Sequence, residues 1–592
     1  MPHRRRGRRT PTGTAMTSTR GARVVGPAVV VALACLALAP VLLARGFVLV
    51  GDMTFVPEQP WSGAWLGLDG SVPRAVPADA FVSAATQVLP GDLLQKAVLL
   101  LALVLAGFGM LRLVRAFLPA AVIPATGAAV LYLWNPWVLE RLAIGHWGLL
   151  VGYAALPWVT VAALAVRRGE RGVLAVVPAL AVAAFSSPTG GIAAALVALV
   201  VVAERARLAR AAALLGAVVV LNLPWLLPGL LGNAAPTDPE GVHAFAARAD
   251  TPLGAWGSLL TFGGIWKKSI VPGERDAWLL VLLALALTVA GLVFLVRRAR
   301  AADVPVRRLL ALAGAGWVLA ALPTSAVGAD VVVALVEHVP GAGILRDSQK
   351  WLLLLVLAVC LGVGLGLEAL QRWLDARGGP ARAVTATLAL LPVVLLPTFA
   401  WGISGDLDPV RYPAEWSRAA SVLGDRPAAD RRTVVLPWSA YQRFTWNGDR
   451  AALDPAIRFF PGQVVTNDDL AVRDRTVTGE DRAAARIGAA LGDGRPLAPV
   501  LADLGIRYVL IERTAPAGES STAAYPALRA AGTVLHQGPE LELLDLGSGR
   551  SAPSVSYAPL IVVGDVLALV LALGSMIFCA VRRIRSKPDN LG

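Results

Sequence analysis

Long apolar runs separated by short polar segments dominate the chain. About twelve of them are long enough, or nearly long enough, to cross a bilayer, since a spanning helix needs about 20 mainly apolar residues. The fifth and sixth are short and flank a tight turn at 186–190, so they either cross separately or form a re-entrant pair. The pattern predicts a polytopic α-helical membrane protein of about 12 transmembrane helices. The runs are 25–45, 97–114, 118–136, 148–166, 172–187, 189–203, 211–231, 277–296, 308–325, 351–369, 383–401 and 558–581.

Lys and Arg gather in alternate short loops, and such loops are usually cytoplasmic. With twelve spans, all of these loops fall on one side together with both termini, so we expect cytoplasmic termini at a plasma membrane. An alternative is that the first run is a cleaved signal peptide, which would leave an odd number of spans. The basic residues include Arg4, Arg5, Arg6, Arg112, Arg115, Arg167, Arg168, Arg297, Arg298, Arg372, Arg582 and Arg583.

The polar material lies on the other side of the membrane in this topology. It predicts large outer loops at 46–96, 232–276 and 326–350, and a 402–557 segment of globular composition. We therefore divide the chain into four parts. They are a basic cytoplasmic N-terminus (1–24), a membrane domain of about 11 helices (25–401), an extracytoplasmic α/β domain (402–557), and a last helix with a basic cytoplasmic tail (558–592).

The 402–557 segment alternates strand-like and helix-like patterns. It holds no phosphate-binding glycine loop, zinc spacing or nucleophile elbow, so we interpret it as a substrate-binding or docking domain. The expected strands are 432–438 and 506–511, the expected helices are 481–491 and 497–504, and a hairpin is expected over 533–546.

Composition agrees with a membrane protein. The chain is 56% hydrophobic, and only 16% of its residues are charged, whereas soluble proteins average about 25% charged residues. The net charge of +14 follows the membrane topology, which argues against nucleic acid as a partner. Three cysteines, each in a hydrophobic run, indicate neither a disulfide framework nor a metal motif. No cofactor is predicted, and the acids present neither require nor forbid a divalent metal.

Asp52 follows the first predicted span and opens the 46–96 loop. Carboxylates close to a bilayer are costly and tend to be functional, so Asp52 is a candidate general base, with Glu58 and Asp69 as further acids in the same loop. The alternative is an Asp that caps a turn. Trp61 in this loop suits a sugar-binding platform or, alternatively, an interfacial aromatic belt.

Two other segments carry candidate binding residues. Arg346, Asp347 and Lys350 precede the tenth span on the outer side, where two cations run against the charge rule and would suit a phosphate. The alternative is that they snorkel to the interface. Between the third and fourth spans, Glu140 and Arg141 could pair, and His146 could donate to a sugar or phosphate oxygen or be purely structural. Trp266, Lys267 and Lys268 form a lesser basic spot.

Taken together, these segments resemble the GT-C-fold membrane glycosyltransferases of actinobacteria, in particular arabinofuranosyltransferase-like proteins. The resemblance lies in Gly51-Asp52, in the segment from Asn135-Pro136-Trp137 to His146-Trp147, in 153–158, in 345–350 and in the 504–509 strand. The chain departs from the family pattern in that the next acid after Asp52 is six residues away, and a long carbohydrate-binding extension is missing.

The resemblance implies an inverting glycosyltransferase with Asp52 as its base. The donor would be a polyprenyl-phosphate-linked arabinofuranose or mannose, and the acceptor a cell-envelope glycan or glycolipid. Two alternatives stay open. A non-catalytic scaffold of envelope biosynthesis would keep the fold without the chemistry, and a lipid or polysaccharide transporter would need ionisable residues within its spans. The spans hold few of these apart from Asp565.

Overall fold

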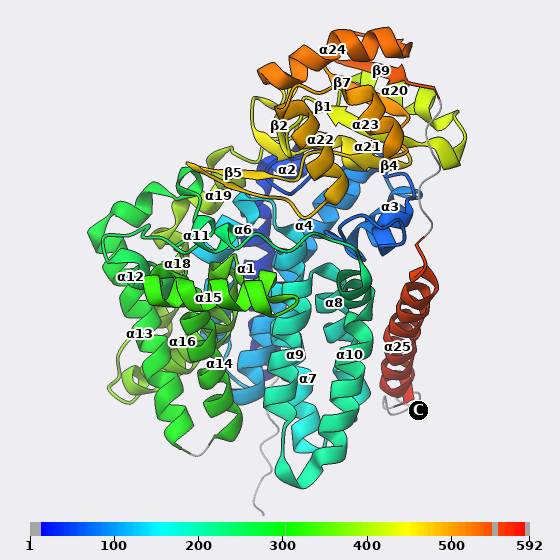
Figure 1. The fold of residues 1–592 in the computed structure, drawn as a ribbon. Helices are drawn as coiled ribbons and strands as arrows, with labels where there is room; N and C mark the ends of the chain where they lie inside the picture. The colour runs from blue at the N-terminus through cyan, green and yellow to red at the C-terminus, as the bar shows by residue number, and fades with distance from the viewer. Residues whose placement is uncertain (1–13, 302, 548–554, 586–592) are drawn as a thin grey trace, which may run out of the picture.

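The structure is a computed structural model, and it describes residues 14–301, 303–547 and 555–585. A body of roughly parallel helices carries a smaller α/β domain at one end, and the last helix returns along the side of the body (Figure 1). Parts of the predicted N-terminus and tail, including Arg4, Arg5 and Arg6, lie outside the described residues.

Within the described residues, seven helical segments are long and apolar enough to cross a membrane, judged by length and composition. A pair of helices, Ala381–Leu395 and Pro397–Ser404, is bent by 73° and is either a broken span, which would be the eighth, or a re-entrant loop. The multi-pass α-helical fold is thus confirmed, but a count of twelve is not, because several predicted runs form shorter helices. The seven are α4 (Gly91–Phe117), α7 (Trp147–Arg168), α10 (Leu208–Leu231), α13 (Trp278–Arg300), Val304–Thr324 with α14, Ser348–Asp375 with α16, and Ala558–Arg582 in α25.

The other helices fill the remaining predicted runs and the polar face. Each predicted apolar run contains at least part of one helix, so hydrophobicity located the elements and overstated the length of some. They are α1 (Thr14–Ala37), α2 (Ala39–Leu43), α3 (Ala78–Thr86), α5 (Ile123–Leu133), α6 (Pro136–Ala143), α8 (Val177–Ser186), α9 (Pro188–Val202), α11 (Glu240–Ala244), α12 (Gly254–Leu260), α15 (Ala326–His338), α17 (Ala381–Ala389), α18 (Leu391–Leu395) and α19 (Ala400–Ser404).

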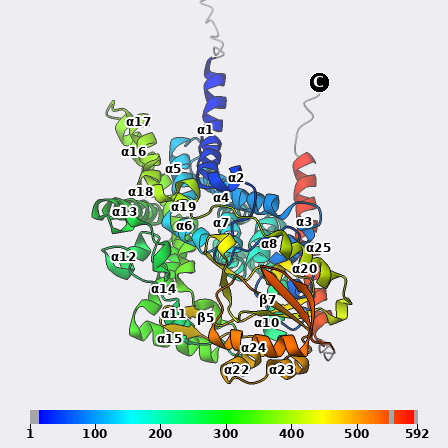
Figure 2. The same ribbon diagram turned by 90° about the horizontal axis from the view of Figure 1, so that it is seen from above.

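Two spans form the centre of the helical body. The apolar window of the Ser348–Asp375 span is 78% buried and that of α7 is 72% buried, against 22% for α13 and 28% for α25. Most of the apolar window of α13 and of α25 is therefore not buried inside the protein. These exposed apolar side chains need a non-aqueous environment, which the bilayer supplies. Figure 2 shows the same arrangement from above, with α25 at one edge of the body.

The α/β domain is built on a five-stranded sheet of order β4-β1-β7-β9-β8. The strands β4, β1 and β7 are parallel, and β9 pairs antiparallel with both β7 and β8. The predicted strands, helices and closing hairpin of this domain are confirmed. The strands are β1 (Arg432–Leu436), β4 (Gln463–Val465), β7 (Tyr508–Glu512), β8 (Thr533–Gln537) and β9 (Leu541–Asp545); the helices are α20 (Ala414–Gly424), α21 (Ala456–Phe459), α22 (Arg482–Gly492), α23 (Leu497–Asp503) and α24 (Glu519–Ala531).

Backbone hydrogen bonds join this domain to the 46–96 loop. The Gly51 amide donates to the Ala451 carbonyl at 2.9 Å, and the Leu453 amide donates to the Gly51 carbonyl at 2.8 Å. Gly51 thus extends the small ladder of β2 (Tyr441–Arg443) and β3 (Ala451–Leu453). A second bridge pairs Phe47 with Val410. The loop that opens with Asp52 is therefore fixed against the domain.

Candidate functional site

Two glycines bring the Asp52 segment against the corner that precedes α7. Gly51 and Gly145 have positive φ values of 53° and 80°, which favour glycine. A Cβ on Gly51 would lie 2.0 Å from the Ile144 carbonyl oxygen, and one on Gly145 would lie 2.3 Å from the Met53 amide nitrogen. The Asp52 amide donates to the Ile144 carbonyl at 3.0 Å. This backbone contact places Asp52 beside His146.

Both carboxylate oxygens of Asp52 have partners. His146 Nε2 lies 3.2 Å from Oδ2, and the Tyr441 hydroxyl, which comes from the α/β domain, donates to Oδ1. The Asp52 side chain remains 44% exposed. Burial raises the pKa of its carboxyl, but the His146 hydrogen bond and charge, the Tyr441 hydroxyl and the charge of Arg458 outweigh burial and lower the pKa overall. Asp52 is therefore ionised at neutral pH and can accept a proton.

Arg141, in α6, contacts the ring nitrogen of His146 that is not directed at Asp52. Its guanidinium is fully buried and donates to Asp347 with both terminal nitrogens, and Nη2 also donates to Gln349 Oε1. Nη1 lies 3.2 Å from His146 Nδ1. Because an arginine can only donate, Nδ1 must accept, and the ring proton lies on Nε2 facing Asp52. Arg141 thus fixes the His146 tautomer that donates to the carboxylate.

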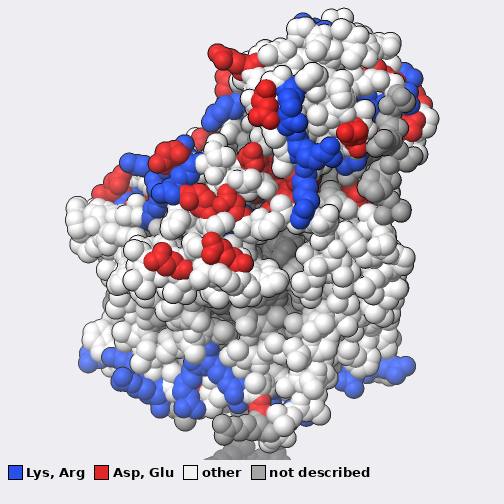
Figure 3. Space-filling view, in the orientation of Figure 1, with Lys and Arg blue, Asp and Glu red and all other residues white. Residues whose placement is uncertain are grey.

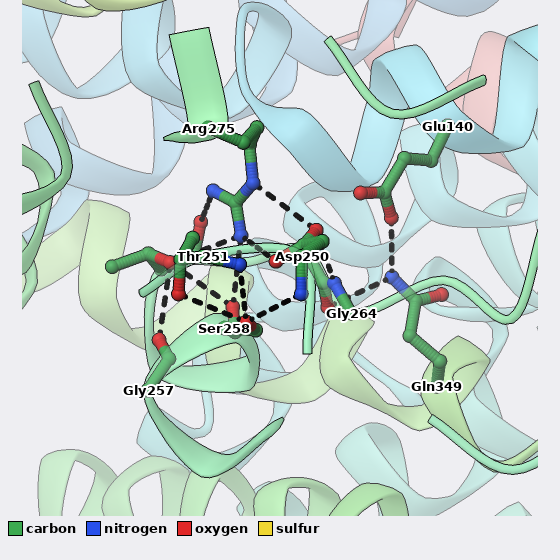
Figure 4. A network of polar contacts seen from close by, with 10 residues as sticks. Glu140, Asp250, Thr251, Gly257, Ser258, Gly264, Arg275 and Gln349 are labelled. Atoms are coloured by element: carbon green, nitrogen blue, oxygen red, sulfur yellow. Dashed lines mark hydrogen bonds and ion pairs between the residues drawn. The ribbon is translucent and has the colours of Figure 1, made fainter. Parts of the chain in front are cut away.

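Glu140 lies on the other side of Gln349. The sequence suggested that it could pair with Arg141, but the structure shows no such ion pair between these two described residues. Glu140 Oε2 accepts from Gln349 Nε2 at 2.8 Å, while Oε1 has no hydrogen-bond partner among the described residues. Burial and the charge of Asp250 raise the pKa of the Glu140 carboxyl well above its ordinary value. Neighbouring Asp250 pairs with Arg275 at 2.6 Å (Figure 4). Glu140 and Gln349 are thus buried, and Arg141 and His146 connect them to Asp52.

The remaining predicted residues are spread more widely. Arg346 pairs with Glu480 of the α/β domain at 3.1 Å. The positive charge of Lys350 acts on Asp347. Burial raises the pKa of the Asp347 carboxyl, but Arg141 and the charge of Lys350 outweigh burial and lower this pKa overall. Glu58 and Trp61 are exposed, Trp61 at 58%, and no described contact joins either of them to Asp52.

Two further residues lie near Asp52, and the sequence pointed only to Lys267, through the lesser basic spot at 266–268. Tyr441 follows no recognisable motif, and only the docking of the domain brings it to Asp52. Lys267 lies close enough to interact with Asp52 electrostatically; burial and Arg443 lower the pKa of its ammonium, and Asp52 partly offsets them. Its run of adjacent basic residues was the one signal available for it. No three His, Cys, Asp or Glu side chains in the described part of the chain are placed to hold a metal ion together.

The helical membrane body and its α/β domain define a GT-C fold, and comparisons with known proteins agree with this class. The family model described as the N-terminal GT-C domain of alpha-(1->3)-arabinofuranosyltransferase matches residues 268–541. The cryo-EM structure of arabinofuranosyltransferase AftD from Mycobacteria is similar, with a TM-score of 0.57 and 17% identity over 89% of this chain. The resemblance predicted from the sequence is thereby confirmed.

A second AftD structure, the R1389S mutant, gives a TM-score of 0.54 at 17% identity over 89% of this chain. This chain spans about 40% of the length of the AftD chains that it matches. No curated protein matches the sequence. The likeness to the solved structures establishes a common fold.

Proposed function

We propose that this protein is a membrane glycosyltransferase that moves a sugar of the arabinofuranose or mannose class from a polyprenyl-phosphate donor to a cell-envelope glycan or glycolipid. The observation that carries the proposal is Asp52. Its carboxylate is ionised and partly exposed, and it is oriented by His146 from the membrane body and Tyr441 from the α/β domain. This arrangement suits a general base at the membrane surface.

In the proposed reaction Asp52 takes the proton of an acceptor hydroxyl. The hydroxyl oxygen bonds to the anomeric carbon of the donor sugar, the bond from that carbon to the phosphate oxygen breaks, and polyprenyl phosphate leaves with the electron pair. A single displacement of this kind inverts the configuration at the anomeric carbon. His146 and Tyr441 act as positioning residues, because both donate to the carboxylate and hold its direction.

The leaving phosphate needs positive charge. Arg141 is committed to Asp347, Gln349 and His146, so we assign it a positioning role. Lys350 and Lys267 are better placed to meet a phosphate, because neither has an ion-pair partner within hydrogen-bonding distance among the described residues. A compact ammonium is a common ligand for phosphate.

We propose that a groove in the helical body receives part of the polyprenyl chain. The space between its atoms is about 510 Å³, part of which is open to solvent, and it is lined largely by apolar side chains of α5, α13 and α18. Asn135, the residue that caps α6, also lines it. The groove therefore extends from helices that face the bilayer to the helix that carries Glu140 and Arg141.

We further propose that the α/β domain is extracytoplasmic and that both termini are cytoplasmic. Lys and Arg gather at the end of the helical body opposite the α/β domain, whereas acids and bases mix on the domain side (Figure 3). The excess of cations at one end follows the rule for cytoplasmic loops.

Transfer by the purified protein in nanodiscs tests the function. Polyprenyl-phospho-arabinose and polyprenyl-phospho-mannose would be compared as donors, with wild type, Asp52→Asn and the control Asp493→Asn, whose carboxylate is 64% exposed in the α/β domain. We expect Asp52→Asn to lower kcat by about 10²–10⁴-fold, the usual contribution of a general base, and the control to match wild type. A folded wild-type protein that transfers neither sugar would contradict the proposal and favour a scaffold.

A further inference from the structure

A second pocket lies between the 46–96 loop and the α/β domain. It encloses about 910 Å³ of space between atoms, part of which is open to solvent. The loop contributes one wall with Trp65, Asp69 and Arg74, and the domain contributes the other with Arg458 and Asp468. Arg74 and Asp468 join the walls through an ion pair of 2.8 Å.

Asp69 presents an unsatisfied acceptor at this pocket. Its Oδ1 accepts from the Ser71 hydroxyl at 2.7 Å and from the Ser71 amide at 3.1 Å. Its Oδ2 is buried and meets no hydrogen-bond donor among the described residues. A buried carboxylate oxygen without a donor is costly. In the proposed complex a rotation of the Asp69 side chain turns this oxygen to a ligand hydroxyl, which supplies the missing bond.

The edge of the sheet adds backbone groups to the same pocket. β4 is the edge strand and pairs with β1 alone in the described sheet. Gln463, Val464, Val465 and the following Thr466 and Asn467 line the pocket. An unpaired strand edge presents N–H and C=O groups, which can bond to the hydroxyls of a sugar without selecting a charged ligand.

The charge of the lining indicates a neutral ligand. Four carboxylates, from Asp69, Asp79, Asp468 and Asp481, face two guanidinium groups, from Arg74 and Arg458. Such a net acidic wall repels a phosphate. Lys350 and Lys267, which suit the donor phosphate, are not among the residues that line this pocket.

Direct contacts connect this pocket to Asp52. Arg458 Nη1 donates to the Thr54 hydroxyl at 2.6 Å, two residues after Asp52. Leu453, a lining residue, bonds to the Gly51 carbonyl, and Ala440 of the lining precedes Tyr441. We propose that this pocket binds the acceptor as a neutral oligosaccharide and directs its terminal hydroxyl to Asp52. The assignment to an acceptor rests on the proposed function; the binding of a neutral oligosaccharide does not.

Binding and turnover test the two parts separately. The full chain in nanodiscs would be titrated with synthetic arabinofuranosyl and mannosyl trisaccharides, and with inorganic phosphate as a charged probe, for wild type, Asp69→Asn and the control Asp503→Asn, which is 62% exposed in the same domain. We expect a trisaccharide to bind wild type and the control equally. Asp69→Asn should weaken it by about tenfold or more, as for loss of a charge-assisted hydrogen bond. In turnover, Asp69→Asn should raise the acceptor KM and leave the donor KM unchanged.

The outcomes separate the two proposals. Equal trisaccharide affinity in wild type and Asp69→Asn, no trisaccharide binding by wild type, or competition by phosphate would overturn the pocket, whatever the transferase assay gives. Trisaccharide binding that depends on Asp69, without transfer from either donor, would support the pocket and contradict the glycosyltransferase. If Asp69→Asn lowers the melting temperature, Ser71→Ala takes its place. It removes one of the two hydrogen bonds that hold the Asp69 carboxylate, while the Ser71 amide keeps the other, and unchanged trisaccharide affinity in that variant overturns the pocket as well.

Discussion

The Tyr441 hydroxyl donates a hydrogen bond to Asp52 across 389 residues of sequence. His146 holds the second carboxylate oxygen, so the membrane body and the α/β domain each orient one side of the same group. The domain that sequence patterns assigned only to binding or docking therefore also contributes directly to the site around the proposed base.

Tyr441→Phe should move the pH dependence of transfer. The hydroxyl is one of the groups that lower the Asp52 pKa, so its removal raises that pKa. In the proposed reaction, activity requires the ionised carboxylate and is lost as pH falls through its pKa. The acid limb of kcat/KM should therefore shift to higher pH. Tyr525→Phe, which removes a hydroxyl without a described partner, is the control. Superimposable profiles for Tyr441→Phe and wild type would contradict the role of Tyr441.

Loss of Asp347 should destabilise the protein more than loss of the whole ion pair. Asp347→Asn leaves the fully buried Arg141 without its carboxylate, and breaking such a pair costs about 3–5 kcal/mol. Arg141→Met combined with Asp347→Asn removes both charges and should recover part of this loss. Thermal unfolding in detergent compares Arg141→Met, Asp347→Asn and the double variant, and strictly additive changes in melting temperature would argue against the coupling.

Gly145→Ala should impair catalysis by displacing Asp52 from His146. The new Cβ would lie 2.3 Å from both the Met53 amide nitrogen and the Val50 carbonyl oxygen, so the backbone must move. A shift of about 1 Å at a reacting group can lower the rate by about 10²-fold, and we expect a loss of that size in kcat. Gly494→Ala is a matched control, because Gly494 also has a positive φ but has no atom within 4 Å of its Cβ position. Similar kcat values for the two variants would refute the packing argument.

The α/β domain should lose stability as pH rises from 5 to 8. Burial raises the pKa of Asp454 to about 6, and burial together with the Asp454 charge raises the pKa of Glu512 well above its ordinary value. Raised acid pKa values stabilise the fold while the groups are protonated, and this contribution is lost as pH rises through the folded-state pKa. Glu512→Gln should flatten the fall in melting temperature between pH 5 and pH 8, whereas the exposed control Glu519→Gln should not. An equally steep fall in Glu512→Gln would contradict the assignment.

Apolar runs located the helices because their signal is local. The runs failed to give the number of full crossings because segments such as α5, with 11 residues, and α8, with 10, are apolar but short. The same logic applies to the site. Gly51-Asp52 and Gly145-His146 could be noticed as motifs in the sequence, since the residues that matter are adjacent. The Arg141–Asp347 pair and the Tyr441 contact could not, because both depend on long-range packing.

The pairing of Gly51 with Ala451 and Leu453 has a consequence for biosynthesis. The ribosome makes residue 52 early, but the strand that completes its surroundings emerges only about 400 residues later. Throughout that interval the nascent chain holds Asp52 without Tyr441. The surroundings of Asp52 are therefore completed only after most of the helices have been synthesised. The folding of the α/β domain sets the time at which the site forms.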